Sequence, residues 1–330
     1  MGKNNSCMKK SKRIFKTVLK TIGVLFLVMT ALFLISVFKT NYNKTFLNKL
    51  DAEILYMKPD KNWVRSIYKA KLGGQDEELL VASKGENDTN GNVIDMVYNS
   101  DKNKIFYMTE NVDGSKIFEF DLNNKTTKVL PDMEHKVVSD MYLFLNKNVL
   151  VYSSSKRSTL IEPVDNEEDK IKESEKIDES DDTLKYYYYD FDKNNITEIK
   201  QSEFEKYKDN NELMLETSDV NAPMKSEDGK YSVTDNRGNI YLQNNVTKER
   251  KIIKKYYGIY EPKFSPGYIP LQIVDNKYLV YDRSKHLTPI GQILEILLFQ
   301  RDPYATEIVD LETGETSQYI NHVSYIYQLK

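Results

Sequence analysis

The stretch KIFYMTENVDGSKIFEFDLNNKTTKVL, residues Lys104 to Leu130, decides the fold of this 330-residue chain. It contains three runs rich in alternating apolar side chains, separated first by Asp113-Gly114 and then by an Asn-rich segment. Asp-Gly between such runs is a strong signal for a β-hairpin. We therefore predict three consecutive antiparallel strands, over Ile105 to Thr109, Lys116 to Leu122 and Thr126 to Leu130.

The same order of strand, polar turn and strand recurs three times further along the chain. The recurrences start at residues 186, 239 and 306 and read YYYYDFDKNNITEIK, NIYLQNNVTKERKII and TEIVDLETGETSQYI. Asp121, Asp190 and Asp310 hold equivalent places in the repeat. Further strands are expected upstream, over Val149 to Ser153, Tyr231 to Thr234, Lys277 to Asp282, Val137 to Leu145 and Ile259 to Phe264. Four short antiparallel strands per unit are typical of a propeller blade, so we predict an all-β β-propeller of five to seven blades. A β-sandwich with several hairpins is the alternative.

Outside the blades, the N-terminal region has a different composition. Residues 21–38 read TIGVLFLVMTALFLISVF and contain no charge and no proline, which is long enough for one helix to cross a hydrocarbon core of about 30 Å. The side chains expected to face lipid are Ile22, Leu25, Phe26, Leu27, Leu32, Phe33, Leu34 and Phe38. Residues 1–20 carry seven basic and no acidic side chains. The positive-inside bias then predicts a cytosolic tail, a single-pass helix in the cell membrane and an extracytoplasmic remainder.

A cleaved signal peptide is the alternative reading of this segment. Its cleavage site needs small residues, and the sequence from Ser36 to Thr40 offers no A-x-A pattern. We therefore expect an uncleaved anchor. Residues 39–60 are expected to form a stalk, in which Phe46, Leu47, Leu50 and Ile54 recur at helical spacing, and residues 61–330 form the propeller.

The charge of the part after the anchor limits its partners. Residues 39–330 carry 40 basic and 50 acidic side chains, so bulk charge gives no attraction to nucleic acid or to anionic lipid. The single cysteine, Cys7, lies in the cytosolic tail, so the domain has no disulfide and depends on packing. Abundant Tyr, Ile, Val and Phe favour strands. The richness in Lys, Asn and Ile suggests a bacterial source with AT-rich coding.

Two insertions interrupt the repeats. Residues 158–183 are acidic and nearly free of large apolar side chains, which predicts a disordered loop. In residues 287–300, Thr288-Pro289 predicts a helix start, and the rest of the segment is expected to continue as an apolar helix. Such a helix packs over the propeller or turns one side toward a partner protein or the outer membrane leaflet. Ile293, Leu297 and Phe299 are the candidate partner surface.

We find no sequence motif that indicates a catalytic site or a cofactor. The nucleophile elbow, the zinc-protease motif, the phosphate loop and the dinucleotide fingerprint are all missing, and the three histidines share no ligand spacing. One run resembles the start of a calcium loop, with Glu86, Asp88, Asn90 and Asp95 as oxygen ligands. Its first position is Glu and its twelfth is Val97, so a polar turn between strands explains it equally well.

Several short motifs resemble known propeller repeats. SEDGKYSV (Ser226 to Val233), PKFSPGYIP (Pro262 to Pro270) and IVDLETGETSQYI (Ile308 to Ile320) are similar to TolB-like repeats, with Glu227 where proline is usual. KIFYMTENVDGSKIFEF also resembles bacterial propellers related to the YWTD repeats. The resemblance covers about residues 93–325. It implies a propeller, and such propellers serve as scaffolds, as adaptors and as lids of peptidases.

The leading hypothesis from the sequence is a membrane-anchored extracytoplasmic propeller that binds a protein or an envelope component and has no catalytic role. Its loops, held in place by rigid blades, would make the contacts. One alternative is an enzyme with an unrecognised active site in the central funnel. Another is a regulatory or sensory partner of a membrane signalling complex that acts through the anchor.

Overall fold

The computed structural model describes twenty strands, arranged in five groups of four that we call units 1 to 5. The residues described are 17–24, 27–28, 30–31, 42–60, 64–85, 88, 91–111, 114–131, 136–144, 149–156, 184–209, 223–257, 267–286, 291–293, 296–297, 304–319 and 323–329. Units 2 to 5 are antiparallel meanders, in which each strand pairs with the next one along the chain. This is the strand order of a propeller blade.

The strands of units 1 and 2 belong to one continuous sheet. Unit 1 consists of β20 (Ser324–Gln328), β1 (Glu53–Pro59), β2 (Arg65–Lys71) and β3 (Glu78–Val81). Unit 2 consists of β4 (Asn92–Asn99), β5 (Lys104–Asn111), β6 (Gly114–Asp121) and β7 (Thr126–Val129). A single pairing of Arg65 with Val93 joins the two units.

Units 3, 4 and 5 are separate four-stranded sheets. Unit 3 has β8 (Lys136–Phe144), β9 (Val149–Lys156), β10 (Lys185–Asp190) and β11 (Asn195–Ile199). Unit 4 has β12 (Met224–Lys225), β13 (Tyr231–Asn236), β14 (Asn239–Asn244) and β15 (Arg250–Lys254). Unit 5 has β16 (Tyr268–Val274), β17 (Tyr278–Ser284), β18 (Tyr304–Asp310) and β19 (Thr316–Gln318).

Unit 1 joins the two ends of the chain. Its innermost strand, β20, comes from the C-terminus and pairs antiparallel with β1, with Ile54 opposite Gln328 and Leu55 opposite Tyr327. The Tyr327 hydroxyl also donates a hydrogen bond to the carbonyl of Met96, at 3.0 Å, in unit 2. The all-β prediction is thus confirmed, and the described blades number five.

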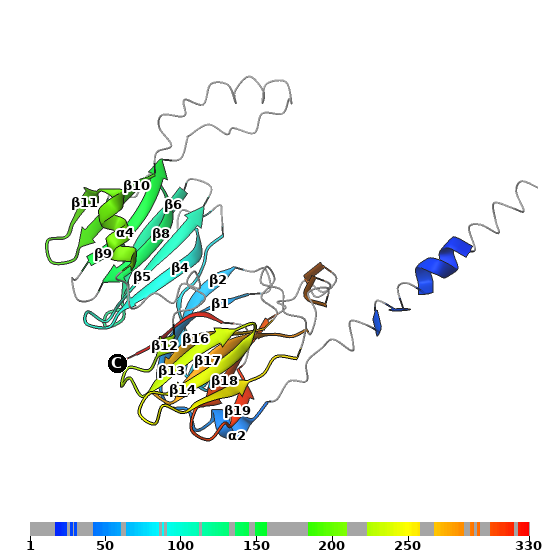
Figure 1. Ribbon diagram of the computed structural model, residues 1–330. Helices are drawn as coiled ribbons and strands as arrows, with labels where there is room; N and C mark the ends of the chain where they lie inside the picture. Colours follow the sequence, from blue (N-terminus) through cyan, green and yellow to red (C-terminus); the bar gives the residue numbers. More distant parts are fainter. Residues whose placement is uncertain are drawn as a thin grey trace, which may run out of the picture.

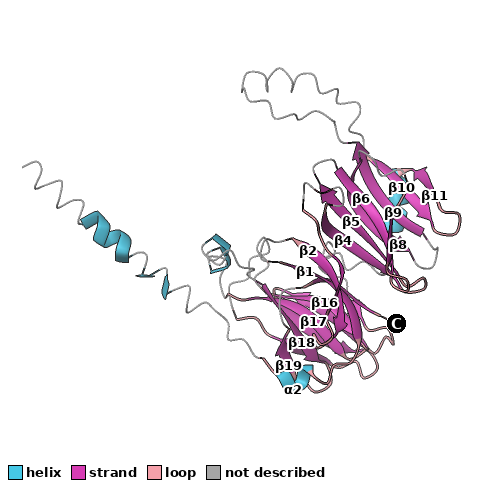
Figure 2. Cartoon of the chain, turned by 180° about the vertical axis from the view of Figure 1, so that it is seen from behind, coloured by secondary structure: helices cyan, strands magenta, loops and turns pink. Residues whose placement is uncertain are grey.

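Four apolar cores join neighbouring units. Unit 4 packs on unit 5 through Val233, Ile240 and Leu279, and unit 5 packs on unit 1 through Val280 and Ile326. A third core joins units 1 and 2, with Met57, Ile67 and Phe120 among its members, and a fourth joins units 2 and 3, with Phe106, Leu150 and Tyr152. The units thus follow one another in the order 4, 5, 1, 2, 3, and Figures 1 and 2 show them as an arc.

Helix α4 (Gln201–Asp209) covers the free face of unit 3. Its Phe204, which is 2% exposed, packs on Val149 and Val151, and it contacts the ring of Tyr186 at a centroid distance of 4.7 Å. These strand residues alternate with those that pack on unit 2, so both faces of unit 3 are apolar. Helix α4 therefore closes one end of the arc in the manner of a capping element.

The same turn connects the third strand to the fourth in each of units 2 to 5. The side-chain oxygens of Asp121, Asp190, Asn244 and Asp310 each accept hydrogen bonds from the backbone N–H groups two and three residues later, at 2.8 to 3.3 Å. The residue four places on has a positive φ in every case, and these are Lys125, Asn194, Lys248 and Gly314. The predicted equivalence of the three aspartates is confirmed, and Asn244 is the fourth member.

The two ends of the units differ in their connections. Each unit has short turns at the end where the third strand passes to the fourth, which we call the turn end. The opposite end, which we call the loop end, holds the long connections, namely residues 82–91 before β4, 157–184 before β10 and 285–303 before β18, together with the two-residue hairpins β5–β6 and β13–β14. Both predicted insertions therefore belong to the same end of the fold.

Three expectations differ from the structure. Residues 39–60 do not form a separate stalk: α2 (Lys44–Leu47) is one short turn, Glu53–Pro59 is strand β1, and Phe46, Leu47, Leu50 and Ile54 are all buried in the core between units 1 and 5. The first hairpin pairs Asn111 with Gly114, so Gly114 begins β6 rather than ending the turn. The strand expected over residues 259–264 lies outside the described residues, and β16 begins at Tyr268.

Within the described part of the chain, we find no helix that is both long enough and apolar enough to cross a bilayer. Residues 17–24 are helical, and Ile22 and Leu27 are 57% and 68% exposed. The other predicted lipid-facing residues lie outside the described residues, namely Leu25, Phe26, Leu32, Phe33, Leu34 and Phe38.

Candidate functional site

A buried ion pair lies near the loop end of unit 5. Arg283 in β17 is 3% exposed, and its Nε donates a hydrogen bond to Oε1 of Glu307 in β18 at 2.6 Å. The Tyr281 hydroxyl donates to the other carboxylate oxygen, also at 2.6 Å. Both oxygens of Glu307 are therefore engaged, as a buried charge requires.

The ionisable groups around this pair respond to burial and to its charges. Burial lowers the pKa of Lys254, in β15, although the nearby Glu307 carboxylate opposes that shift. Burial raises the pKa of Tyr268, and burial together with the charge of Glu307 raises the pKa of Tyr281 well above its usual value. The cluster joins the fourth strand of unit 4 to the first three strands of unit 5 and leaves the two tyrosines neutral at physiological pH.

Next to the ion pair, a network of uncharged groups holds the loop that follows β17. The Ser284 hydroxyl donates to the carbonyl of His286 at 2.7 Å, and Nε2 of Gln292 donates to the same hydroxyl oxygen at 2.7 Å. The Tyr256 hydroxyl, which follows β15, also donates to the His286 carbonyl, at 3.2 Å. Ser284, His286 and Gln292 are all at most 4% exposed. The start of the helical insertion is thus fixed to two units.

Apolar side chains of the helical insertion face outward. Ile293, Ile296 and Leu297 are 39%, 42% and 70% exposed, while Gln292, next to Ile293, is 4% exposed. We call these three residues the loop-end apolar surface. The sequence placed Ile293 and Leu297 in the candidate partner surface, and the third member, Phe299, lies outside the described residues. Ile296 was not among the predicted residues, although its spacing from Ile293 puts both on one face of a helix.

The backbones of units 4 and 5 touch at the loop end. The N–H of Tyr268 donates to the carbonyl of Gly238 at 3.1 Å, and the N–H of Ser284 donates to the carbonyl of Gly267 at 3.2 Å. A Cβ on Gly267 would lie 2.2 Å from the Cα of Gly238, which is too close for any side chain. The two glycines therefore allow the close approach that places the loop of unit 5 beside unit 4.

The calcium candidate is only partly visible in the structure. Asp88 and Asp95 are described, whereas Glu86 and Asn90 lie outside the described residues. Asp95 belongs to strand β4, and the carbonyl of Asp88 accepts a hydrogen bond from Nδ2 of Asn111 at 3.1 Å. No group of three or more His, Cys, Asp or Glu side chains placed to hold a metal ion occurs among the residues that the structure describes.

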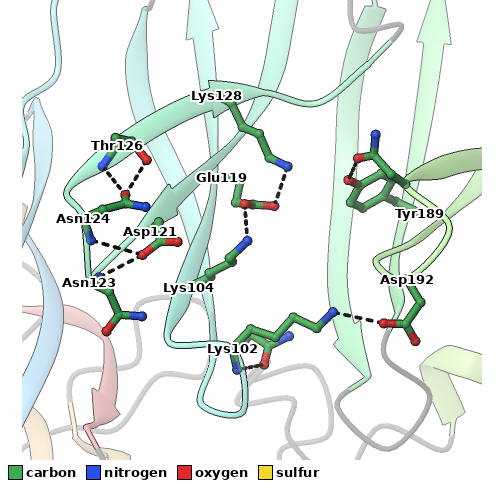
Figure 3. Close-up of polar contacts among 12 residues, drawn as sticks. Lys102, Lys104, Glu119, Asp121, Asn123, Asn124, Thr126, Lys128, Tyr189 and Asp192 are labelled. Carbon is green, nitrogen blue, oxygen red and sulfur yellow. Dashed lines mark hydrogen bonds and ion pairs between the residues drawn. The ribbon is translucent and has the colours of Figure 1, made fainter.

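Polar contacts also tie units 2 and 3 together at the turn end, as Figure 3 shows. Glu119 is 5% exposed, and its carboxylate pairs with Lys104 at 2.6 Å and with Lys128 at 3.3 Å. Lys102 of unit 2 reaches Asp192 of unit 3 at 3.2 Å. These contacts stabilise the scaffold, and sequence patterns did not single them out, because each one joins residues from different strands or turns.

No family model matches this chain, and no curated protein matches it. Among solved structures it is similar to TolB from Acinetobacter baumannii, with 13% identity over 81% of this chain and 52% of that one and a TM-score of 0.32. It is also similar to the isopeptidase AtxE2, with 10% identity over 82% of this chain and 49% of that one and a TM-score of 0.45. The propeller domain of the trilobed protease from Pyrococcus furiosus gives 11% identity, 86% and 71% coverage and a TM-score of 0.29.

This chain therefore spans about half the length of the first two of these proteins. All three scores are low, and the proteins named include enzymes. We therefore base the fold on the strand order of the five units, and the function on the surface of this chain.

Proposed function

We propose that this protein is a single-pass, membrane-anchored extracytoplasmic scaffold that binds another protein at its loop end and catalyses no reaction itself. The observation that carries the proposal is the loop-end apolar surface. Its three side chains are exposed, yet Gln292 beside them is buried and hydrogen-bonded to the blade. An exposed apolar group on a fixed support is typical of a protein-binding site.

The anchor part of the proposal rests on residues 21–38 and on the basic tail before them. Eighteen uncharged residues suffice to cross a bilayer as a helix, and seven basic side chains favour a cytosolic N-terminus. The helical residues among 21–31 expose apolar side chains such as Ile22, Val24 and Leu27, which suit a lipid environment.

A protein partner suits the loop-end apolar surface better than lipid does. Just after the anchor, the chain reaches α2, where Asn43 bonds Ser317 and Glu315 of unit 5 at 2.8 and 2.9 Å. Phe46 of α2 also contacts Tyr278, at the turn end of β17. The insertion leaves β17 at its other end, after Ser284. The surface thus lies at the end of unit 5 opposite the anchor attachment.

Photocrosslinking in intact cells tests this function. We would place a photoreactive amino acid at Leu297 and, as a matched control, at the exposed Thr127 of β7. The expected result is a discrete protein adduct from position 297 that disappears with Ile293→Ser. Equal adduct patterns at the two positions, or adducts with lipid alone at position 297, would reject the scaffold function.

A further inference from the structure

The outermost strand of unit 4 differs from the outermost strands of the other units. The charged side chains of β3, β7 and β11 form ion pairs: Glu78 with Lys125, Lys128 with Glu119, and Glu198 with Lys185. In unit 5 the outermost strand, β19, contacts α2. Strand β15 pairs with β14 on one side, and no described strand pairs with its other side.

Positive charge is concentrated along β15. Residues 224–255 contain eight basic and four acidic side chains, although the whole chain has a net charge of −3. Five of the basic residues lie on β15 or beside it, together with one acidic residue, Glu249: they are Lys248, Arg250, Lys251, Lys254 and Lys255. Within the described residues, none of these five forms an ion pair within 4.0 Å.

The contacts of these basic groups are with aromatic rings. The guanidinium of Arg250 lies 4.7 Å from the ring centroid of Tyr241, and Nζ of Lys255 lies 5.3 Å from that of Tyr257. Such contacts orient a cation without neutralising it. Lysines often lie on edge strands because they prevent aggregation, but β3, β7 and β11 carry only one charged residue each, and each of these is paired with an opposite charge. Lys254 is half-buried near the Glu307 carboxylate, but Lys248, Arg250, Lys251 and Lys255 are exposed, and their charge calls for an anionic partner.

A hollow of 310 Å³ opens beside the N-terminal end of β15, between units 4 and 5. Its apolar lining consists of Tyr231, Leu242 and Leu311, which are 6%, 2% and 2% exposed. Glu249, Lys251 and Glu312 are the charged residues of its lining. The hollow thus joins an apolar floor to the edge strand and can accept one large apolar side chain.

We propose that β15 binds an extended acidic peptide of the partner protein, which adds to unit 4 as a fifth strand. The backbone of the peptide pairs with the outer edge of β15, and its carboxylates lie on one face, where they pair with Arg250; Lys251 lies on the opposite face, at the hollow. One apolar side chain enters the hollow above Leu311. Strand addition of this kind obtains its affinity from main-chain hydrogen bonds and its specificity from pockets for alternate side chains.

A peptide accounts for these features better than the other polyanions do. A bilayer of anionic lipid or a nucleic acid can neutralise the lysines, but neither can pair with the N–H and C=O groups of a strand edge. Strand β15 also leads to the loop-end apolar surface. Tyr256 lies two residues after β15, and its hydroxyl donates a hydrogen bond to the carbonyl of His286, which precedes the helical insertion. The inference rests on the proposed function in needing a partner protein, but it concerns a different surface.

The test is a fluorescence anisotropy titration of the full-length protein in detergent. The probe is a fluorescein-labelled octapeptide of alternating Glu and Val, and an octapeptide of alternating Lys and Val is the charge control. A third octapeptide, with proline in place of each Val, keeps the charge but cannot pair as a strand. We expect only the Glu-Val peptide to bind, with an affinity that falls as salt rises.

Matched variants then locate the site. The double change Arg250→Glu with Lys251→Glu should weaken binding of the Glu-Val peptide at least tenfold, while Lys200→Glu, an exposed charge reversal next to β11, should leave it unchanged. Thermal unfolding shows whether each variant is folded. Leu297→Ser should also leave peptide binding unchanged, which separates this site from the loop-end apolar surface.

Three results would overturn the inference. The first is equal binding of the Glu-Val peptide and its proline analogue, which would indicate charge alone. The second is peptide binding that survives the double charge reversal. The third is a wild type that binds phosphatidylglycerol vesicles but no peptide, together with a double variant that no longer binds the vesicles. That result would make β15 a lipid contact.

Discussion

At the residue scale, the ion pair of Arg283 and Glu307 is buried, with side chains 4% and 11% exposed. Removing one partner leaves the other charge buried without compensation, which typically costs about 3 to 5 kcal/mol. We expect Arg283→Leu and Glu307→Leu each to lower the free energy of unfolding by that amount. The double variant should lose much less than the sum of the two. Urea denaturation of all four proteins gives the coupling, and strictly additive losses would show that the pair does not act as a unit.

The carboxylate of Glu77 predicts a specific pH dependence. Burial by itself raises the pKa of Glu77, but hydrogen bonds from Lys58, whose Nζ lies 2.7 Å from each carboxylate oxygen, and from Tyr56 outweigh it and lower that pKa. A pKa lowered on folding stabilises the fold above the unfolded value, and this stabilisation is lost as the pH falls. The loss should begin below about pH 4.5.

The measurement for Glu77 compares urea midpoints of the wild type and Glu77→Gln between pH 7 and pH 3. Because the side chain is about a third exposed, the expected difference at pH 7 is modest, roughly 1 kcal/mol. The two proteins should converge in stability as the pH falls. A difference that stays constant over this range would assign the effect of the substitution to packing.

At the element scale, the repeated turn predicts a series of related effects. Each of Asp121, Asp190, Asn244 and Asp310 accepts two backbone N–H groups, and such a hydrogen bond contributes about 0.5 to 1.5 kcal/mol net. Asp310 also pairs with Lys277 at 3.3 Å and is 5% exposed. We therefore expect Asp310→Ala to lower the midpoint of urea denaturation most. Gly314→Asn should change it little, since Asn194 holds the equivalent position of unit 3 with a positive φ.

The hairpins were predictable because their signals are local. Tyr278–Ser284 and Tyr304–Asp310 follow a regular order of strand and turn, and the aspartate turns recur at fixed offsets. Strand β1 was not predicted, because Ile54, Leu55, Tyr56 and Met57 are buried on both faces and give no alternation. A continuous apolar run of this kind can be read as helix or strand, and a core on each side of the strand decided between them here.

The candidate site was predictable to a similar degree. The apolar insertion showed in its composition, so Ile293 and Leu297 were identified, and both are exposed. The buried polar network beside this insertion was not predicted, because Ser284, Gln292 and Glu307 lie in segments where alternate polar residues usually face water. The charge of β15 was visible in the sequence as KERKIIKK, but only the sheet order shows that this segment is an unpaired outer strand.

At the scale of the whole molecule, β20 connects the last residues of the chain to the first strand. Ile326, 1% exposed, belongs to the core between units 1 and 5, and Tyr327 bonds unit 2. A chain ending at residue 322 should therefore lose the packing of unit 1 against both neighbours. We expect a lower melting temperature and a broader, less cooperative transition by calorimetry. A truncated protein that melts like the full-length one would show that β20 adds nothing to the closure of unit 1.

The proposed anchor and the position of α2 together predict how the protein is oriented. From Phe38 to Asn43 the chain covers five residue steps, which span at most about 18 Å. Asn43 is bonded at unit 5 beside the turn end, so that end must lie near the bilayer if residues 21–38 cross it. Strands β17 and β18 of unit 5 are seven residues long, about 20 Å, and they place the loop-end apolar surface on the far side.

Lipid quenching measures this orientation. In a Cys7→Ser background, Thr313→Cys lies at the turn end and Leu297→Cys in the loop-end apolar surface, and both positions are exposed. A fluorophore at position 313 should be quenched by spin-labelled lipid headgroups in proteoliposomes, and one at position 297 should not, because quenching falls steeply with distance. Stronger quenching at position 297 would place the insertion in the outer leaflet and make lipid, rather than a protein, the ligand of that surface.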